Sequence, residues 1–262
     1  MNDELLVGIT EKFTEEVAKL VPEIYKDAGQ PAIWKIGKTL GLLWDSCVHL
    51  RAVLYSAETR ARLAPRIRQY LNEIAAIEND NLCEVPAQIG VPILERLTYV
   101  TDDDIADLFI RLLSSASSEE TINLAHPRFV SLIDSISPDE ARILTYLRGK
   151  KRLEFLQIRV PGVDEDKTLW GIPHRFCLKF PQNMRLYFNN LASLGIFADV
   201  QLSGELDELQ DRRLLEIYGE EIAAATGRVT MAGYYITEFG KMFIRTCTAK
   251  LSSEEIAVPE PP

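Results

Sequence analysis

The chain has 262 residues, of which 47% are hydrophobic and 26% are charged, and this balance excludes an intrinsically disordered protein. Its formal net charge of −10 excludes a protein that coats nucleic acid or anionic lipid with its whole surface, although a local basic patch stays compatible with it. The length allows one elongated domain or two smaller ones.

Two helices are predicted before residue 57. Residues 3–29 carry apolar side chains at three- to four-residue steps with glutamates between them, which is typical of an amphipathic helix. Residues 31–56 are the most apolar long segment, and we expect a helix there that is buried or faces a partner. Membrane contact is the alternative, but Asp45 and Arg51 interrupt the apolar run. Self-association is therefore favoured, and its candidate residues are Trp34, Leu40 and Trp44.

Residues 57–80 predict a further helix, with Pro65 in its first turn. Its expected buried face consists of Leu63, Ile67, Leu71 and Ile74. Four arginines are expected to face solvent and pair with acidic neighbours rather than to bind nucleic acid, namely Arg60, Arg62, Arg66 and Arg68. Residues 80–92 contain two prolines and a glycine and predict an extended connector.

Residues 101–117 predict a helix that begins with a Thr/Asp cap. Its expected buried side chains are Ile105, Leu108, Leu112 and Leu113. Asp102, Asp103 and Asp104 stand together at its start, where the positive end of the helix dipole explains them without an acid–base site.

His126 stands before Pro127 at the start of another helix, residues 126–136. Because proline disfavours helix at the preceding residue, we place His126 at a helix boundary. His49 and His174 are distant in sequence, and no carboxylate or cysteine stands at ligand spacing. A capping or packing role is therefore favoured over catalysis or metal binding.

The following helix, residues 137–150, has the clearest start in the chain. Ser137 is its cap, Pro138 its first residue and Glu140 the third residue after the cap, which is the capping-box arrangement.

After residue 151 the pattern becomes mixed. Residues 152–160, 197–203 and 229–236 are rich in branched and aromatic side chains and predict strands. Three helices are predicted around these strands. The first lies in the segment 181–197 and stops at Gly195, the second is an inserted helix at 204–227, and the third covers residues 237–249. Residues 161–173 are expected to be an exposed loop.

This order is similar to that of a winged helix. In this comparison residues 191–197 end the recognition helix and lead into the wing, and residues 235–237 lead to Gly240. It departs from that pattern where a second helix is missing between residues 160 and 181 and where a long helix interrupts the wing. We predict a mainly α-helical protein. Its parts are a helical region at 1–137, a winged-helix-like α/β module with an inserted helix at 138–250, and a flexible tail at 251–262.

Three stretches carry a family resemblance: YKDAGQPAIWKIGKTLG (25–41), AHPRFVSLIDSISPDEARILTYL (125–147) and YYITEFGKMFIRTC (234–247). Together they resemble the Abi-alpha family of bacterial proteins, a domain of unknown function named for abortive infection. The resemblance spans about residues 20–247. It implies a role in phage defence and brings no active-site residues, because its motifs concern packing and helix boundaries.

No motif of a common enzyme class occurs, since GxxxxGK[ST], GxSxG and HExxH are all missing from the sequence. The cysteines are too widely spaced for a zinc site or a disulfide framework; they are Cys47, Cys83, Cys177 and Cys247. We expect no cofactor, no metal and no enzymatic activity. The N-terminus lacks signal-peptide features and no window suits a membrane-spanning helix, so a cytoplasmic location is expected.

Two groups of side chains are candidates for binding a protein partner or nucleic acid. One is the basic cluster Arg148, Lys150, Lys151 and Arg152, for which a solvated turn is the simpler explanation. The other is the predicted recognition helix, with Asn183 and Arg185 foremost. Residues 138–250 carry 16 basic and 15 acidic residues, so we expect duplex DNA binding no tighter than non-specific contacts.

The favoured function is a phage-defence interaction or effector protein whose C-terminal half recognises a partner and whose N-terminal helices act or oligomerise. A DNA-binding regulator that uses residues 181–195 is one alternative. A membrane-associating effector that uses residues 33–54 is another, and an enzyme with a site around His126 ranks last. No small-molecule substrate is evident.

Overall fold

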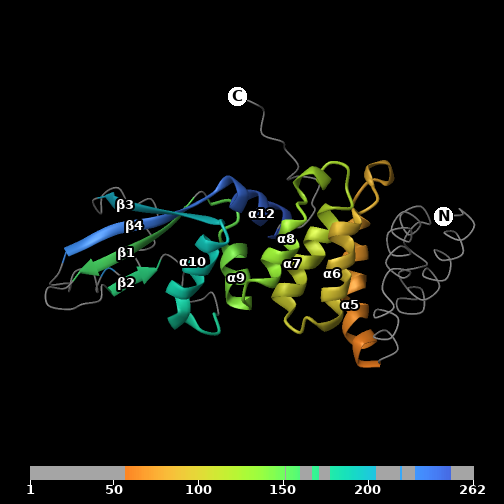
Figure 1. Cartoon of the computed structure of the whole chain (residues 1–262), viewed down its shortest axis with the longest axis horizontal. Helices are drawn as coiled ribbons and strands as arrows, with labels where there is room; N and C mark the ends of the chain where they lie inside the picture. Colours follow the sequence, from red (N-terminus) through yellow and green to blue (C-terminus); the bar gives the residue numbers. More distant parts are fainter. Residues whose placement is uncertain are drawn as a thin grey trace, which may run out of the picture. The chain divides into compact units, whose positions relative to one another are not determined.

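A computed structural model describes residues 57–150, 152–159, 167–170, 178–204 and 228–248, together with Gly219 (Figure 1). These residues form seven α-helices and a four-stranded sheet, so the mainly helical prediction is confirmed for them. The predictions for residues 3–56, for the inserted helix and for the tail lie outside the described residues, as do Trp34, Leu40, Trp44 and Lys151. No helix within the described ranges is long and apolar enough to cross a membrane.

The described residues fall into two compact units. We call residues 57–135 with 245–248 the helical unit, and the described residues between 136 and 244 the sheet unit. The last helix therefore begins in the sheet unit, and its final residues belong to the helical unit.

The helical unit contains α5 (Ala57–Ile74), α6 (Ala87–Tyr99), α7 (Asp103–Ser115) and α8 (Arg128–Asp134). Helices α5, α6 and α7 lie side by side, and α8 packs on α6 and α7 (Figure 1). The side chains predicted to be buried on α5 and α7 are all buried. On α7 the predicted Leu112 is completely enclosed, as are Phe109 and Ile110, which were not in the predicted set. Apolar periodicity thus identified the inner faces of these helices correctly.

Two local predictions in this unit are wrong. Pro65 lies inside α5 rather than in its first turn. Residues 87–92, predicted as part of an extended connector, form the first half of α6 with Pro92 inside the helix. Ile89 of this segment and Ile93, which follows it, are almost wholly buried. Their tertiary packing outweighs the local turn signal of glycine and proline.

The prediction that the α5 arginines face solvent is wrong for Arg66, which is only 6% exposed. Its Nη1 donates hydrogen bonds to the Leu97 carbonyl at 3.0 Å and to the Val100 carbonyl at 2.5 Å. Arg66 therefore satisfies the open carbonyl end of α6, because a long side chain can bury its stem while its head finds acceptors. Arg68 is exposed as predicted.

The sheet unit begins with α9 (Pro138–Tyr146), followed by β1 (Arg152–Arg159) and β2 (Lys167–Trp170). A short 3₁₀ turn, η4 (Pro181–Asn183), leads into α10 (Met184–Ser193), then β3 (Phe197–Gly204), β4 (Arg228–Ile236) and α12 (Glu238–Thr248). The sheet order is β2-β1-β4-β3, and every neighbouring pair is antiparallel. The strands predicted at 152–160, 197–203 and 229–236 are confirmed.

Strand β2 corrects the prediction of a loop at residues 161–173. Its four residues pair with β1, Leu169 standing opposite Leu156. A strand of this length is too short to show an alternating pattern in the sequence. It forms because its backbone pairs with the edge of β1.

Helix α10 packs one face on the sheet (Figure 1). The fully buried ring of Phe188 stacks on Tyr234, with ring centroids 5.5 Å apart and planes inclined by 10°. It also lies 5.5 Å from the Phe197 ring. The helical spacing of Met184, Tyr187, Phe188, Leu191 and Leu194 predicts one apolar stripe, and all of them but the half-buried Leu194 are buried.

The end of α10 is joined to the start of α12 by Thr237. Gly195 ends the α10 segment with φ of +81°, a conformation that favours glycine. The Thr237 hydroxyl donates to the Gly195 carbonyl at 2.6 Å and accepts from the Gly240 N–H at 2.9 Å. One side chain thus caps α12 and holds the turn after α10.

Candidate functional site

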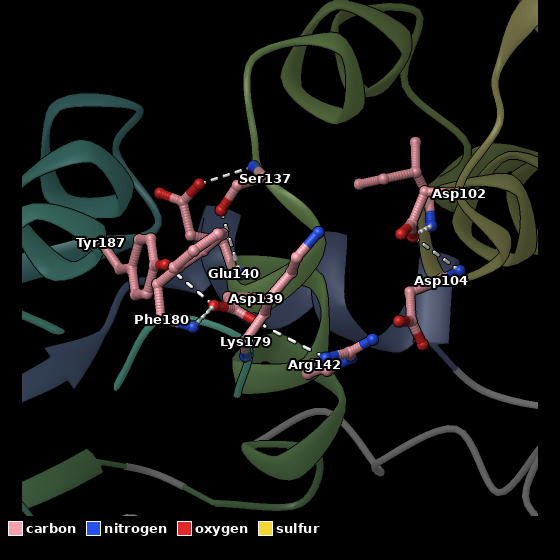
Figure 2. A network of polar contacts seen from close by, with 10 residues as sticks. Asp102, Asp104, Ser137, Asp139, Glu140, Arg142, Lys179, Phe180 and Tyr187 are labelled. Atoms are coloured by element: carbon pink, nitrogen blue, oxygen red, sulfur yellow. Dashed lines mark hydrogen bonds and ion pairs between the residues drawn. The ribbon is translucent and has the colours of Figure 1, made fainter. Parts of the chain in front are cut away.

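The start of α9 is the best-defined polar feature of the sheet unit. The Ser137 N–H donates to Glu140 Oε2 at 2.6 Å, and the Glu140 N–H donates to Ser137 Oγ at 3.4 Å (Figure 2). The predicted capping box is confirmed.

Asp139 is a buried carboxylate that holds the segment leading into α10. Its side chain accepts hydrogen bonds from the backbone N–H groups of Lys179 and Phe180, each at 2.8 Å, and from the Tyr187 hydroxyl at 2.9 Å (Figure 2). Arg142 Nη1 lies 3.4 Å from the same carboxylate. Asp139 itself is 2% exposed.

Glu140 makes a second link to α10, since its Oε1 accepts from Asn190 Nδ2 at 2.8 Å. Two adjacent acids of α9 therefore bond to the entry of α10 through Asp139 and to its last turn through Glu140. Both contacts lie on the inner side of α10.

The hydrogen bonds determine the protonation states of Asp139 and Tyr187. Burial alone would raise the pKa of the Asp139 carboxyl, but the N–H groups of Lys179 and Phe180 and the Tyr187 hydroxyl outweigh it and lower the pKa. Burial, followed by the hydrogen bond to Asp139, raises the pKa of Tyr187 to about 12. Asp139 is thus an anion and Tyr187 a neutral donor near neutral pH. This arrangement positions a helix, because donors already occupy both carboxylate oxygens.

The opposite side of α10 faces solvent. We define the α10 face as four exposed residues at three- to four-residue spacing: Gln182, Arg185, Leu186 and Asn189. Leu186 is 63% exposed and Phe180 is 45% exposed. The sequence has no aspartate or glutamate between Lys167 and Ala198. The α10 face therefore combines one cation, two amides and one large apolar side chain.

The α10 face contains only part of what the sequence indicated. Arg185 is exposed on it, whereas Asn183 is half-buried at the helix start and Asn190 is turned toward Glu140. Leu186 was missed. Leu186 carried a signal, because it falls outside the apolar stripe that Tyr187, Phe188 and Leu191 share.

Two members of the basic cluster lie against aromatic rings. Lys150 Nζ is 3.9 Å from the Tyr146 ring centroid. Arg152 Nη1 donates to the Tyr235 hydroxyl at 3.3 Å, with its guanidinium 6.0 Å from that ring. Arg148 is half-buried in the turn after α9. Arg148, Lys150 and Arg152 are all half-buried, whereas Arg185 is exposed, so the α10 face is the stronger candidate site.

His126 lies at the helix boundary, as predicted. Its Nδ1 accepts a hydrogen bond from the Arg128 N–H at 3.1 Å, and its ring centroid is 5.9 Å from that of Phe129. Within the described ranges, no group of three or more His, Cys, Asp or Glu side chains is arranged to hold a metal ion. The contacts of His126 are those of a capping residue.

We expect His126→Ala to destabilise the helical unit by about 1 kcal/mol, the usual effect of losing a capping hydrogen bond. His126→Asn should restore most of the loss, because an asparagine carbonyl can accept the same N–H. Urea unfolding of the purified variants measures both effects. Equal losses in the two variants would contradict the capping role.

Comparison with known proteins adds one match. A family model described as abortive infection alpha matches residues 58–247, a range that covers most of both units. It includes the stretches at 125–147 and 234–247 on which the family resemblance was based, and excludes the stretch at 25–41. No curated protein and no solved structure matches the chain.

Proposed function

The chain belongs to the abortive infection alpha family, and on this premise we propose that it is a cytoplasmic phage-defence protein that acts by binding a partner and not by catalysis. Family membership supports the role in abortive infection. The binding role is supported by one observation, the α10 face. Its helix is anchored on the inner side by Asp139 and Glu140, and on the outer side it leaves Leu186 and Arg185 exposed.

We further propose that the sheet unit is winged-helix-like. In support of this, α9, β1, α10, β3, β4 and α12 follow one another in the predicted order, and β4 lies between β1 and β3. Strand β2 stands where a second helix would precede α10. The segment between β3 and β4, residues 205–227, lies outside the described residues except for Gly219.

For the N-terminal segment we propose self-association through Trp34, Leu40 and Trp44, with membrane contact as the alternative. The apolar composition of residues 31–56 supports both, and Asp45 and Arg51 favour the first. Light scattering combined with liposome flotation separates them. A protein that stays monomeric and does not float with liposomes would contradict both.

The defence role is tested by measuring phage plating on bacteria that express the wild type or a variant at equal level. We expect the wild type to restrict phages from a broad panel, and Arg185→Glu combined with Leu186→Glu to abolish the restriction. Both replaced side chains are exposed, so the fold should survive.

The matched control combines Lys241→Glu on α12 with Thr145→Glu on α9. It makes the same charge change at exposed positions of the sheet unit outside the α10 face. This control should restrict phages as the wild type does. Restriction that the α10-face variant retains would contradict a binding role for the face, and no restriction by the wild type would contradict the defence role.

A DNA-binding regulator is the second candidate, because Gln182, Arg185 and Asn189 are exposed on α10 and their side chains can read base edges. We expect duplex binding at physiological salt no tighter than about 10⁻⁶ M, the range of non-specific contacts. Fluorescence anisotropy with fragments of the host genome measures it. Nanomolar, sequence-dependent binding that Arg185→Ala removes would favour the regulator.

A further inference from the structure

Helices α5 and α7 meet along a row of polar side chains. Arg66 Nη2 lies 3.7 Å from Asp103 Oδ1, and one turn later Gln69 Nε2 donates to Asp107 Oδ1 at 2.9 Å. Glu73 is the next side chain of α5 in this row, one further turn along the helix. Positions three and four residues apart share one side of a helix, so Glu73 is also directed toward α7.

The Glu73 carboxylate is incompletely hydrogen-bonded. Its Oε2 is buried, and none of the described residues donates a hydrogen bond to it. The two donors of α7 that act on this carboxylate bind elsewhere: Ser114 Oγ donates to the Ile110 carbonyl at 2.9 Å, and Arg111 Nη1 donates to the Thr248 carbonyl at 2.9 Å. A buried anionic oxygen without a donor costs free energy, whereas a protonated carboxyl group carries no charge.

Opposing influences act on the protonation of Glu73. Burial is the largest of them and raises the pKa of the carboxyl group. Ser114, Arg111 and Gln69 lower this pKa and Asp107 raises it, and the net direction is upward. The folded protein therefore holds the Glu73 proton to a higher pH than the unfolded chain does.

The other helix packed on α5 keeps its titratable groups away from Glu73. Helix α6 carries Glu95, Arg96 and Tyr99, all in its last turns. The same end of α6 accepts a hydrogen bond from Arg66, which precedes Glu73 by two turns of helix, about 10 Å. The charged groups that face Glu73 are therefore those of α7.

We propose that Glu73 is a proton-linked contact between α5 and α7, which is complete when its carboxyl group is protonated and is weakened when that group ionises. The protonated group buries Oε2 without an unpaired charge, whereas the ionised group draws water toward the interface. The contact belongs to the helical unit and the α10 face to the sheet unit, so the proposed function does not depend on it.

The contribution of Glu73 to stability should fall as the pH rises. Below the ordinary glutamate pKa of about 4.3 the carboxyl group is protonated in both the folded and the unfolded chain, so burial carries no penalty. Between that value and the raised pKa only the folded protein keeps the proton, and folding becomes less favourable with increasing pH. Above the raised pKa the loss is complete and constant.

The full-length wild type is compared with Glu73→Gln, which keeps the size of the side chain and cannot ionise. Circular dichroism measures both melting temperatures from about pH 4 to about pH 7. We expect the wild type to lose melting temperature relative to Glu73→Gln as the pH rises, because all other groups titrate alike in the two proteins. Glu119→Gln is the matched control, since Glu119 is exposed, and its difference from the wild type should stay constant. Parallel curves for Glu73→Gln and the wild type would overturn the proposal.

Carbon-13 NMR of the Glu73 carboxyl group measures the same proton in the wild type, and so remains decisive if Glu73→Gln does not fold. The signal should titrate with a midpoint above about 4.3. Arg111→Gln should raise the midpoint further, because it removes a cation that favours the ionised form. A wild-type midpoint at or below about 4.3, or one that Arg111→Gln does not raise, would contradict the proposed contact.

Discussion

Replacing Asp139 with alanine is expected to destabilise the sheet unit by about 3–4 kcal/mol, because the change removes hydrogen bonds to a buried charge and leaves their donors without an acceptor. The donors concerned are the N–H groups of Lys179 and Phe180 and the hydroxyl of Tyr187. Urea unfolding followed by circular dichroism measures the loss. Since α10 is attached through these groups, phage restriction should fall with it.

Graded variants separate this network from ordinary helix capping. Asp139→Asn keeps one carbonyl acceptor but turns an amide N–H₂ toward a donor, so about half of the loss is expected. Tyr187→Phe removes one hydrogen bond and should cost about 1–2 kcal/mol. Asp102→Ala is the matched control, because Asp102 only caps α7, accepting from the N–H groups of Asp104 and Ile105, and should cost about 1 kcal/mol (Figure 2). Equal losses for Asp139→Ala and Asp102→Ala would contradict the network.

The same carboxylate predicts how stability depends on pH. Because the pKa of Asp139 is lower in the folded protein than in the unfolded chain, its contribution is fully present above the ordinary carboxyl pKa of about 4. The contribution disappears as the pH falls from there through the lowered pKa. The stability difference between the wild type and Asp139→Ala should therefore shrink below about pH 4. A difference that grows on acidification would contradict the assigned charge.

Replacing Gly240 with alanine is expected to destabilise the sheet unit by about 3 kcal/mol, the upper end of the usual range for overpacking. An added Cβ would lie within van der Waals overlap of the Ile196 backbone, 2.3 Å from its carbonyl oxygen and 3.0 Å from its carbonyl carbon. A backbone cannot rotate away as a flexible side chain would. The gain in helix propensity, about 1 kcal/mol for alanine over glycine, is smaller.

Gly149 and Gly195 are the matched controls for Gly240. Both have positive φ angles, +75° and +81°, but open space surrounds the position of an added Cβ. Alanine at either position should cost only the conformational penalty of about 1–2 kcal/mol. Thermal unfolding of the three variants ranks them. A Gly240→Ala protein as stable as the wild type would contradict the close approach of α12 to the turn after α10.

The sequence alone predicted those elements whose cause is local. Ser137, Pro138 and Glu140 form a capping box from neighbours in the chain, and Asp102 caps α7 in the same way. The inner faces of α5, α7 and α10 follow from apolar periodicity, since one stripe of a helix must face a core wherever that core lies. The helix boundary at His126 follows from Pro127.

Contacts between distant segments decided the rest. Arg66 is buried because the carbonyl end of α6 lies within its reach, and residues 87–92 are helical because Ile89 and Ile93 pack into a core. β2 exists because β1 offers an edge. From the sequence, Asp139 is expected only to be an acidic residue in the first turn of a helix. The tertiary structure brings it within hydrogen-bonding distance of Lys179, Phe180 and Tyr187. In each case the partner lies more than twelve positions away or on another strand, where no periodicity or capping rule applies, so only the folded chain determines which donor meets which acceptor.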